Sequence, residues 1–171
     1  MSADPPRGEP GGGNPKGGSN SSRKRSAARR SARIAAVQAL YQMDLAQTDQ
    51  NDVIAEFASH RFGVEDEGAH AEADAAFFGE IVRGVVRLQR DIDPVIDNQL
   101  AEGWNLVRID TILRATLRSA VYELIERKDI PARVVISEYV DVARAFFEEE
   151  EPKVVNGILD KLARRLRDGE L

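Results

Sequence analysis

Hydrophobic residues recur at intervals of three and four along most of the chain from about Ser26 onward. This interval is the period of one face of an α-helix, and no stretch shows the strict alternation that is typical of a β-strand. We therefore predict an all-α fold of about seven helices. Their apolar positions lie within residues 34–45, 53–57, 77–88, 94–100, 109–124, 135–147 and 154–166. The pattern is most regular in 109–124, which we expect to form the central helix.

A few residues with special backbone properties punctuate this pattern. Asp93 followed by Pro94 is typical of a helix N-cap and first turn, so we expect a new helix to begin there. Pro131 forbids continuation of the central helix. Gly84 and Gly157 fall inside helical patterns, where Gly costs about 1 kcal/mol relative to Ala. We expect both glycines to allow a close approach between helices.

The first 20 residues contain six Gly and four Pro and almost no apolar side chains. Such a segment buries too little apolar surface to offset the entropy lost on ordering. We predict that residues 1–25 form a disordered Gly/Pro/Ser-rich basic extension and that residues 26–168 form a single all-α domain. The acidic stretch 64–74 is expected to be a loop, and Trp104 is expected to lie in a break between helices.

Composition excludes several classes of protein. Hydrophobic residues make up 42% of the chain, which fits a soluble globular domain with a polar extension. No apolar run approaches the roughly 18 residues that span a bilayer, so no membrane interaction is expected. The N-terminus lacks the apolar region of a secretory signal, which predicts a cytoplasmic protein. The absence of Cys excludes disulfides and thiolate chemistry.

The net charge of −5 hides an uneven distribution. Residues 1–35 carry eight Lys and Arg against two acids, a net charge of +6, whereas residues 36–171 carry 16 against 27, a net charge of −11. The basic residues nearest the first predicted helix are Arg23, Lys24, Arg25, Arg29, Arg30 and Arg33. This asymmetry indicates a basic segment for a polyanion on an acidic body that suits a basic protein partner.

The arginines nearest the first helix pose a packing problem. At about 100° per residue, Arg29, Arg30 and Arg33 share the azimuth of the apolar residues that follow them. Burying an unpaired charge costs too much, so we expect core packing to begin near Ile34 and the three arginines to lie on an overhanging turn. Basic residues at a helix N-terminus also oppose the helix dipole, which favours a ligand from outside the chain.

Guanidinium groups bind phosphate bidentately and stack on unpaired bases, so the basic segment fits single-stranded RNA better than duplex DNA. The alternative is a solubilising tail, or arginines that pair with the acidic body. Six phosphate contacts would give a slope of log affinity against log salt of about −4, at roughly −0.7 per contact. Tyr41, two turns beyond Arg33, either packs in the core with its hydroxyl at the rim or stacks on a base.

No catalytic or metal site can be assembled from the sequence. His60 and His70 lie in or near the acidic loop without a known ligand spacing, and no nucleophile has a positioned base. Residues 148–151 are four consecutive Glu, which we interpret as a solvated face, with a docking surface for a basic partner as the alternative. We predict a non-enzymatic protein without a cofactor or a metal.

Five segments follow one another in an order that is known from one protein family. They are ARRSARIAAVQALYQMDL, FFGEIVRGVV, ILRATLRSAVYELIERKDIP, VVISEYVDVARAF and KVVNGILDKLARR. Together they resemble the NusB family of bacterial transcription antitermination factors, over residues 27–167. The resemblance implies a single all-α domain made of two small packed helical subdomains.

The resemblance also implies a function and partners. Family members bind the boxA element of ribosomal RNA leader transcripts together with NusE, a small-subunit ribosomal protein. They join NusA, NusG and RNA polymerase in a complex that suppresses premature termination. The RNA-contacting positions that the resemblance implies are Arg29, Arg30, Arg33 and Tyr41, with Lys153 as a weaker candidate and with Arg23, Lys24 and Arg25 compensating for Ser31, where many relatives have another Arg.

One other function stays open from the sequence, and it is that of a protein–protein interaction module with little direct RNA binding. The oligomeric state also stays open. Some relatives self-associate, and a homodimer would bury the same basic segment.

Overall fold

The computed structural model describes residues 17–60, 74–100 and 109–171. All the regular structure in these ranges is helical, which confirms the all-α prediction. The helices are α1 (Gly17–Ala46), α2 (Gln50–His60), α3 (Ala75–Asp97), α4 (Thr111–Glu126), α5 (Ala132–Phe146) and α6 (Glu150–Leu166). The predictions for residues 1–16, for most of the acidic stretch, for His70 and for Trp104 lie outside the described residues.

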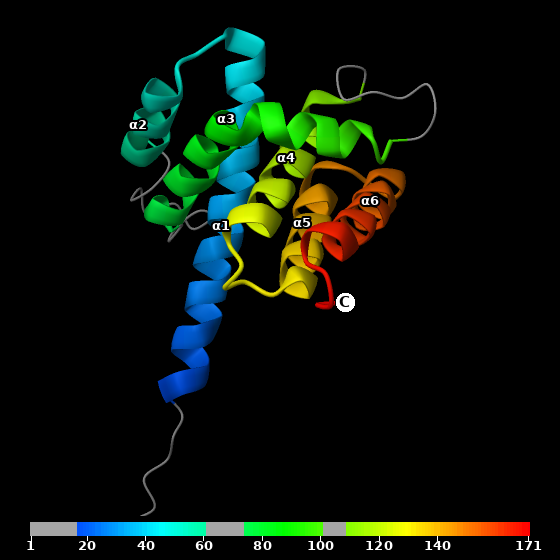
Figure 1. Cartoon of the computed structure of the whole chain (residues 1–171). Coiled ribbons are helices and arrows are strands. Elements are labelled where there is room, and N and C mark those ends of the chain that lie inside the picture. The colour runs from blue at the N-terminus through cyan, green and yellow to red at the C-terminus, as the bar shows by residue number, and fades with distance from the viewer. Residues whose placement is uncertain (1–16, 61–73, 101–108) are drawn as a thin grey trace, which may run out of the picture.

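The six described helices form two groups of three that pack against each other (Figure 1). Helices α1, α2 and α3 make the first group, and α4, α5 and α6 make the second. Helix α4 contacts α1, α3, α5 and α6, which confirms its predicted central position. Buried apolar side chains from all six helices form one continuous core, so the two groups share a single hydrophobic interior.

Side chains at the helix ends explain where several helices begin. The carboxylate of Asp74 accepts a hydrogen bond of 2.9 Å from the backbone N–H of Phe77, which caps the start of α3. The carboxylate of Asp110 caps α4 in the same way, through the backbone N–H of Ile112 at 2.8 Å. Helix α4 ends at Glu126, before Pro131, as the sequence predicts, and α5 begins directly after this proline.

The predicted helix start at Asp93 and Pro94 is wrong, because both residues lie inside α3. The Asp93 carboxylate does not cap a helix but accepts two hydrogen bonds of 2.8 Å from Arg118 of α4. This ion pair holds the last turns of α3 against α4, and the Pro94 carbonyl accepts from the backbone N–H of Asn98 at 3.1 Å. The structure therefore has six described helices where seven were expected.

The two glycines inside helices have different surroundings. A Cβ atom on Gly84 would collide with the ring of Tyr122, so α3 and α4 approach each other there only because the residue is glycine. A Cβ atom on Gly157 would meet nothing within 4 Å. The prediction of close helix packing is thus confirmed at Gly84 and wrong at Gly157. Among the described helices, none has both the length and the apolar character that a bilayer crossing requires.

Candidate nucleic-acid interface

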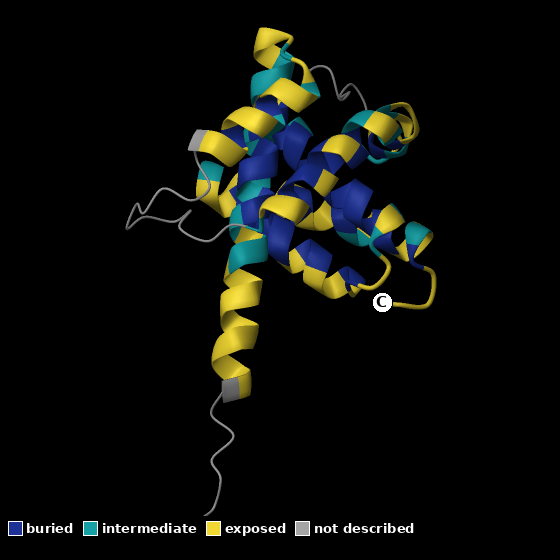
Figure 2. Ribbon diagram, turned by 90° about the vertical axis from the view of Figure 1, so that its left-hand side faces the viewer, coloured by how far each residue is buried: buried dark blue, intermediate teal, exposed yellow. Residues whose placement is uncertain are grey.

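The first turns of α1 project away from the helical body. Figures 1 and 2 show this projection from two directions, and residues 18–27 are exposed. We call residues 17–30 the arm. Helix α1 starts at Gly17 rather than near Ser26, so residues 17–25 are helical where a disordered extension was expected. No proline between Pro15 and Ala46 interrupts this helix. The arm therefore presents the exposed side chains of Arg23, Lys24 and Arg25 on a continuous helix.

Arg33 lies in the core, so the expectation that it overhangs the body is wrong. Its side chain is only 3% exposed. The guanidinium donates two hydrogen bonds of 2.9 Å to the carboxylate of Glu123, which is fully buried. A carboxylate oxygen of Glu138 lies 3.7 Å from the same guanidinium. Arg33 does lie on the core-facing side of α1, as its position in the helix predicts. It can be buried there because it is paired with a carboxylate, whereas an unpaired charge could not be.

The environment of Arg33 favours its charged form. Burial alone lowers the pKa of the guanidinium, but the hydrogen bonds and the charge of Glu123 outweigh burial and raise the pKa above its ordinary value. Removing either partner of such a pair would leave the other charge buried and alone. Arg33 and Glu123 therefore join α1 to α4 as a structural unit.

Arg30 is paired with carboxylates but stays accessible. It donates hydrogen bonds of 3.1 and 3.2 Å to Glu138, and its guanidinium lies 3.4 Å from Asp141. The hydrogen bonds that Arg30 donates to Glu138 are the main reason that the pKa of Arg30 is raised. About half of the Arg30 side chain (49%) is exposed, so solvent screens both pairs. An anion from outside can compete for this guanidinium.

Arg29 is held by an aromatic ring and not by an acid. Its guanidinium lies 5.4 Å from the centroid of the Phe77 ring, a distance typical of a cation–π contact. The guanidinium groups of Arg33 and Arg127 lie at 5.1 and 5.2 Å from the same ring. The Nε atom of Arg29 is buried without a hydrogen-bond partner, and Arg29 makes no ion pair with the described residues. Its charge is available to a ligand.

Tyr41 lies at a different place on α1. It is 36% exposed, so its side chain is accessible at the surface of the body. Its ring borders an apolar cavity of about 490 Å³ that also includes Leu45, Ile112 and Phe146. Leu45 is 61% exposed. Tyr41 stands eleven residues after Arg30, about 16 Å along the helix axis, so the arm and Tyr41 form separate surfaces.

Lys153 is exposed on α6 and borders a cavity of about 630 Å³ lined by residues of α5, α6 and the turn between them, including Arg144, Glu148 and Glu149. Asp141 pairs with Arg144 of this cavity and with Arg30 of the arm. Within the described ranges, no group of three or more His, Asp and Glu side chains has the arrangement of a metal site.

Sequence reasoning missed the residues that fix the arm to the body. Phe77, Glu123 and Glu138 come from α3, α4 and α5, and each contacts at least one arginine of α1. The available signal was a charged residue on an otherwise apolar helix face, as Glu123 is between Val121 and Leu124. Such a residue requires a buried partner, but the sequence does not say which of the 24 basic residues supplies it.

An all-helical body with a projecting cationic helix defines an all-α protein with a candidate nucleic-acid interface. A model of the NusB family matches residues 30–164, and the chain belongs to this family of transcription antitermination proteins. A transcription antitermination protein NusB from Nitrobacter hamburgensis is 60% identical over 139 residues, which cover 81% of this chain and 87% of the relative. One from Rhodopseudomonas palustris is 58% identical over 139 residues, covering 81% and 82%.

Solved structures show the same fold. T. maritima NusB superposes with a TM-score of 0.66 at 32% sequence identity, covering 80% of this chain and 90% of that one. A chain from a crystal structure of the antitermination factors NusB and NusE in complex with dsRNA superposes with a TM-score of 0.68 at 25% identity, covering 81% and 97%.

Proposed function

We propose that the chain binds the boxA element of ribosomal RNA leader transcripts through its arm. The observation that carries this proposal is the group of exposed or half-exposed cations on one projecting helix, at Arg23, Lys24, Arg25, Arg29 and Arg30. Guanidinium groups in this setting suit phosphate, which they bind through paired N–H donors. The similar chain that was crystallised with NusE and dsRNA supports a nucleic-acid ligand.

The arginines of α1 divide into two roles under this proposal. Arg29 and Arg30 contact RNA, because Arg29 forms no ion pair with the described residues and Arg30 exchanges screened partners for phosphate. Arg33 is a positioning residue, because its hydrogen bonds to Glu123 are buried and hold α1 in place. Five phosphate contacts on single-stranded RNA give an expected salt slope of about −3.5.

NusE, a small-subunit ribosomal protein, is the protein partner that we propose. The cavity at Tyr41 and Leu45 is mostly apolar, and exposed apolar patches mark protein interfaces. The acidic body, with a net charge of −11 over residues 36–171, would speed the encounter with a basic protein. Tyr41 then belongs to the protein interface and not to the RNA interface.

The larger assembly follows from these two contacts. RNA and NusE bound together would bring the chain into a complex with NusA, NusG and RNA polymerase that suppresses premature termination. Lys153 would extend the proposed RNA surface where the RNA strand reaches α6.

One observation favours a second function for the chain. Arg30 and Arg33 both have carboxylate partners, which fits a protein–protein interaction module with little direct RNA binding. A second copy of the chain covering the arm is a further form of this alternative.

Binding assays with a boxA oligonucleotide and a scrambled oligonucleotide, each with and without NusE, separate the two functions. We expect the variant Arg29→Ala with Arg30→Ala to lose at least about tenfold in boxA affinity, since two charge-assisted contacts are removed. The matched control is Arg165→Ala, an exposed arginine on α6. Equal affinities for the wild type and the double variant would leave the interaction module as the function.

A further inference from the structure

The ring of Phe77 on α3 has three guanidinium groups around it. Those of Arg29, Arg33 and Arg127 lie 5.4, 5.1 and 5.2 Å from the ring centroid, within the range of a cation–π contact. They come from α1 and from the C-cap of α4, so one ring joins three helices. Phe77 is only 4% exposed, so the ring itself cannot stack on a base of a bound RNA. Any effect of Phe77 on RNA binding is therefore exerted through the arginines.

Two of these three arginines are neutralised by carboxylates. Arg33 donates two hydrogen bonds of 2.9 Å to Glu123. Arg127 donates a hydrogen bond of 3.0 Å to each oxygen of Asp129 and one of 2.6 Å to Glu80. The third guanidinium, which the arm supplies, forms no ion pair with the described residues. It is therefore the one charge at this ring that an anion from outside can take without displacing a carboxylate.

Asp129 is a carboxylate whose charge reaches Arg29 without binding it. The pKa of Asp129 is lowered to about 2, mainly by the hydrogen bonds that it accepts from Arg127 and in smaller part by the charge of Arg29. Its side chain is 63% exposed, so solvent screens the attraction between Asp129 and Arg29. An Arg29 side chain without the ring of Phe77 could turn toward this acid. The ring therefore competes with Asp129 for the Arg29 guanidinium.

A backbone contact fixes the place at which the arm meets α3. The N–H of Asp74 donates a hydrogen bond of 3.1 Å to the carbonyl of Ala28 on α1. The carboxylate of the same residue accepts a hydrogen bond of 2.9 Å from the N–H of Phe77. Asp74 therefore holds α1 by its backbone and the first turn of α3 by its side chain. This attachment places Phe77 next to Arg29, which directly follows Ala28 in the chain.

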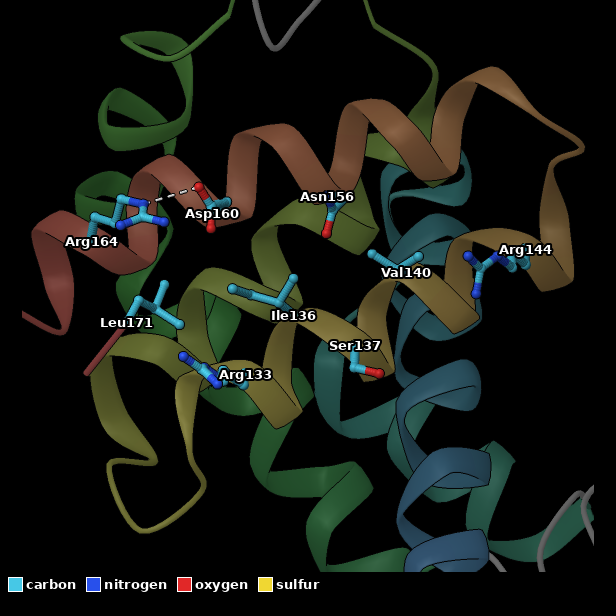
Figure 3. A pocket seen from close by; sticks show the side chains of 9 residues that line it. All are labelled: Arg133, Ile136, Ser137, Val140, Arg144, Asn156, Asp160, Arg164 and Leu171. Carbon is cyan, nitrogen blue, oxygen red and sulfur yellow. Dashed lines mark hydrogen bonds and ion pairs between the residues drawn. The ribbon is translucent and has the colours of Figure 1, made fainter.

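Two exposed arginines of the second helix group are held in another way, by acids on their own helices. Figure 3 shows Arg164 and Asp160 of α6, which line a cavity of about 420 Å³ and are joined by a hydrogen bond of 3.1 Å. Arg144 lines the same cavity and donates to Asp141 of α5 at 2.8 Å. Acids three or four residues away orient these arginines. Helix α1 contains no acid before Asp44, so its arginines are oriented by other helices.

We propose that Phe77 is a positioning residue, which holds the Arg29 guanidinium in the orientation that contacts RNA. This inference rests on the function proposed above and gives a buried residue of α3 a role in binding at the arm. The ring attracts the cation without neutralising it, so Arg29 is ordered in the free protein and keeps its charge for phosphate. Ordering the side chain in advance lowers the entropy that binding would otherwise cost.

A double-mutant cycle on the full chain measures this role. The affinity for a boxA oligonucleotide is compared for the wild type, Phe77→Leu, Arg29→Ala and the variant that carries both changes. We expect Phe77→Leu to lower the affinity about three- to tenfold, because Arg29 must then be ordered on binding. In the Arg29→Ala background the same change should lower the affinity less than about 1.5-fold, because the residue through which Phe77 acts is gone.

Two further variants separate the ring from its bulk. Phe77→Tyr keeps an aromatic face and should retain an affinity within about twofold of the wild type. The matched control is Phe78→Leu, which removes a neighbouring buried ring that stacks on Phe57 at a centroid distance of 5.2 Å. It should destabilise the protein about as much as Phe77→Leu does, but should lower the boxA affinity less than about twofold. Circular dichroism and urea denaturation of each variant give the fraction folded in the binding assay.

A measurement without RNA tests the orientation itself. The Nε atom of Arg29 is buried, and its guanidinium lies over the Phe77 ring. In proton–nitrogen correlation spectra of the wild type, we expect the Arg29 Nε–H proton to be shifted by the ring current and protected from exchange with water. Both properties should be lost in Phe77→Leu and retained in Phe77→Tyr.

The outcomes distinguish this proposal from the proposed function. If the wild type binds boxA and Phe77→Leu binds it equally well, Phe77 does not position Arg29 for RNA. An equal loss with and without Arg29, or an equal loss in Phe78→Leu, would mean that Phe77 acts only on the fold. An Arg29 Nε–H signal that is unchanged in Phe77→Leu would also overturn the proposal. A wild type that does not bind boxA would reject the proposed function, and this role with it.

Discussion

Arg29 and Arg33 lie one helical turn apart on α1, but their environments are opposite. Arg33 is enclosed by Glu123 and Glu138, whereas Arg29 lies against the Phe77 ring and forms no ion pair within the described part of the chain. The same side chain type therefore supports the fold at one position and offers its charge to a ligand at the other. This difference comes from residues on α3, α4 and α5, and it separates stability from binding in a way that substitutions can measure.

Replacing these two arginines should affect different properties. Arg33→Ala leaves the fully buried Glu123 unpaired and should lower the free energy of unfolding by about 3–5 kcal/mol. Arg29→Ala removes only a cation–π contact and should cost less than about 1 kcal/mol, but it should weaken RNA binding. Urea denaturation and RNA titration of both variants check this. A stable Arg33→Ala protein would show that the buried pair does not hold α1.

Asp141 competes with RNA for Arg30 in this account. It lies 3.4 Å from the Arg30 guanidinium and is itself partly exposed. Asp141→Asn should raise RNA affinity about two- to fivefold at low salt, which corresponds to the strength of an exposed ion pair. Asp160→Asn is the matched control, because it releases Arg164 on α6 and not an arginine of the arm. A fall in RNA affinity for Asp141→Asn would mean that Asp141 positions Arg30 for binding.

Helices α3 and α4 contact each other closely at Gly84, because this residue has no side chain. Gly84→Ala would drive a Cβ atom into the ring of Tyr122, and we expect a loss of about 1–3 kcal/mol in stability from overpacking. Gly157→Ala meets open space on α6 and should stabilise the protein by up to about 1 kcal/mol, because Ala is the better helix former. Thermal and urea denaturation measure both. Similar effects of the two substitutions would contradict this packing.

The helical elements were largely predictable, because each carries its own periodic apolar face. The central position of α4 also follows from its pattern. The passage of α3 through Pro94 was not predictable locally, since the Arg118 side chain that binds Asp93 comes from a helix 25 residues away. The burial of Arg33 depends on Glu123, 90 residues away. Long-range ion pairs of this kind leave no periodic signal, so the sequence showed the arm but not which arginines remain free on it.

The whole molecule separates its charges in space. The arm carries cations on a helix that projects from the body, while residues 36–171 have a net charge of −11. Under the proposed function, an RNA strand would be attracted to the arm and repelled by the acidic body. A basic protein would be attracted to the acidic body and would contact the apolar surface of this chain at Tyr41 and Leu45. The two ligands can then bind together without competing for charge.

The association with NusE should accordingly depend on Leu45. Leu45→Glu adds a charge to an exposed apolar surface and should weaken NusE binding by at least about tenfold, while the RNA affinity of the chain alone stays within about twofold, because the arm lies on separate turns of α1. Titration calorimetry with NusE and an RNA shift assay give the two values. Leu45→Ala, which keeps the surface uncharged, serves as the milder comparison. Loss of RNA binding together with NusE binding would place both ligands on one surface.

The most direct test of the arm as the RNA site is the salt dependence of boxA binding by the full chain. We expect a slope of log affinity against log salt of about −3.5 for the wild type, from five cations at roughly −0.7 each. Changing Arg23, Lys24 and Arg25 together to Gln should bring the slope to about −1.4. A slope that stays the same in the triple variant would show that RNA binds elsewhere on the protein.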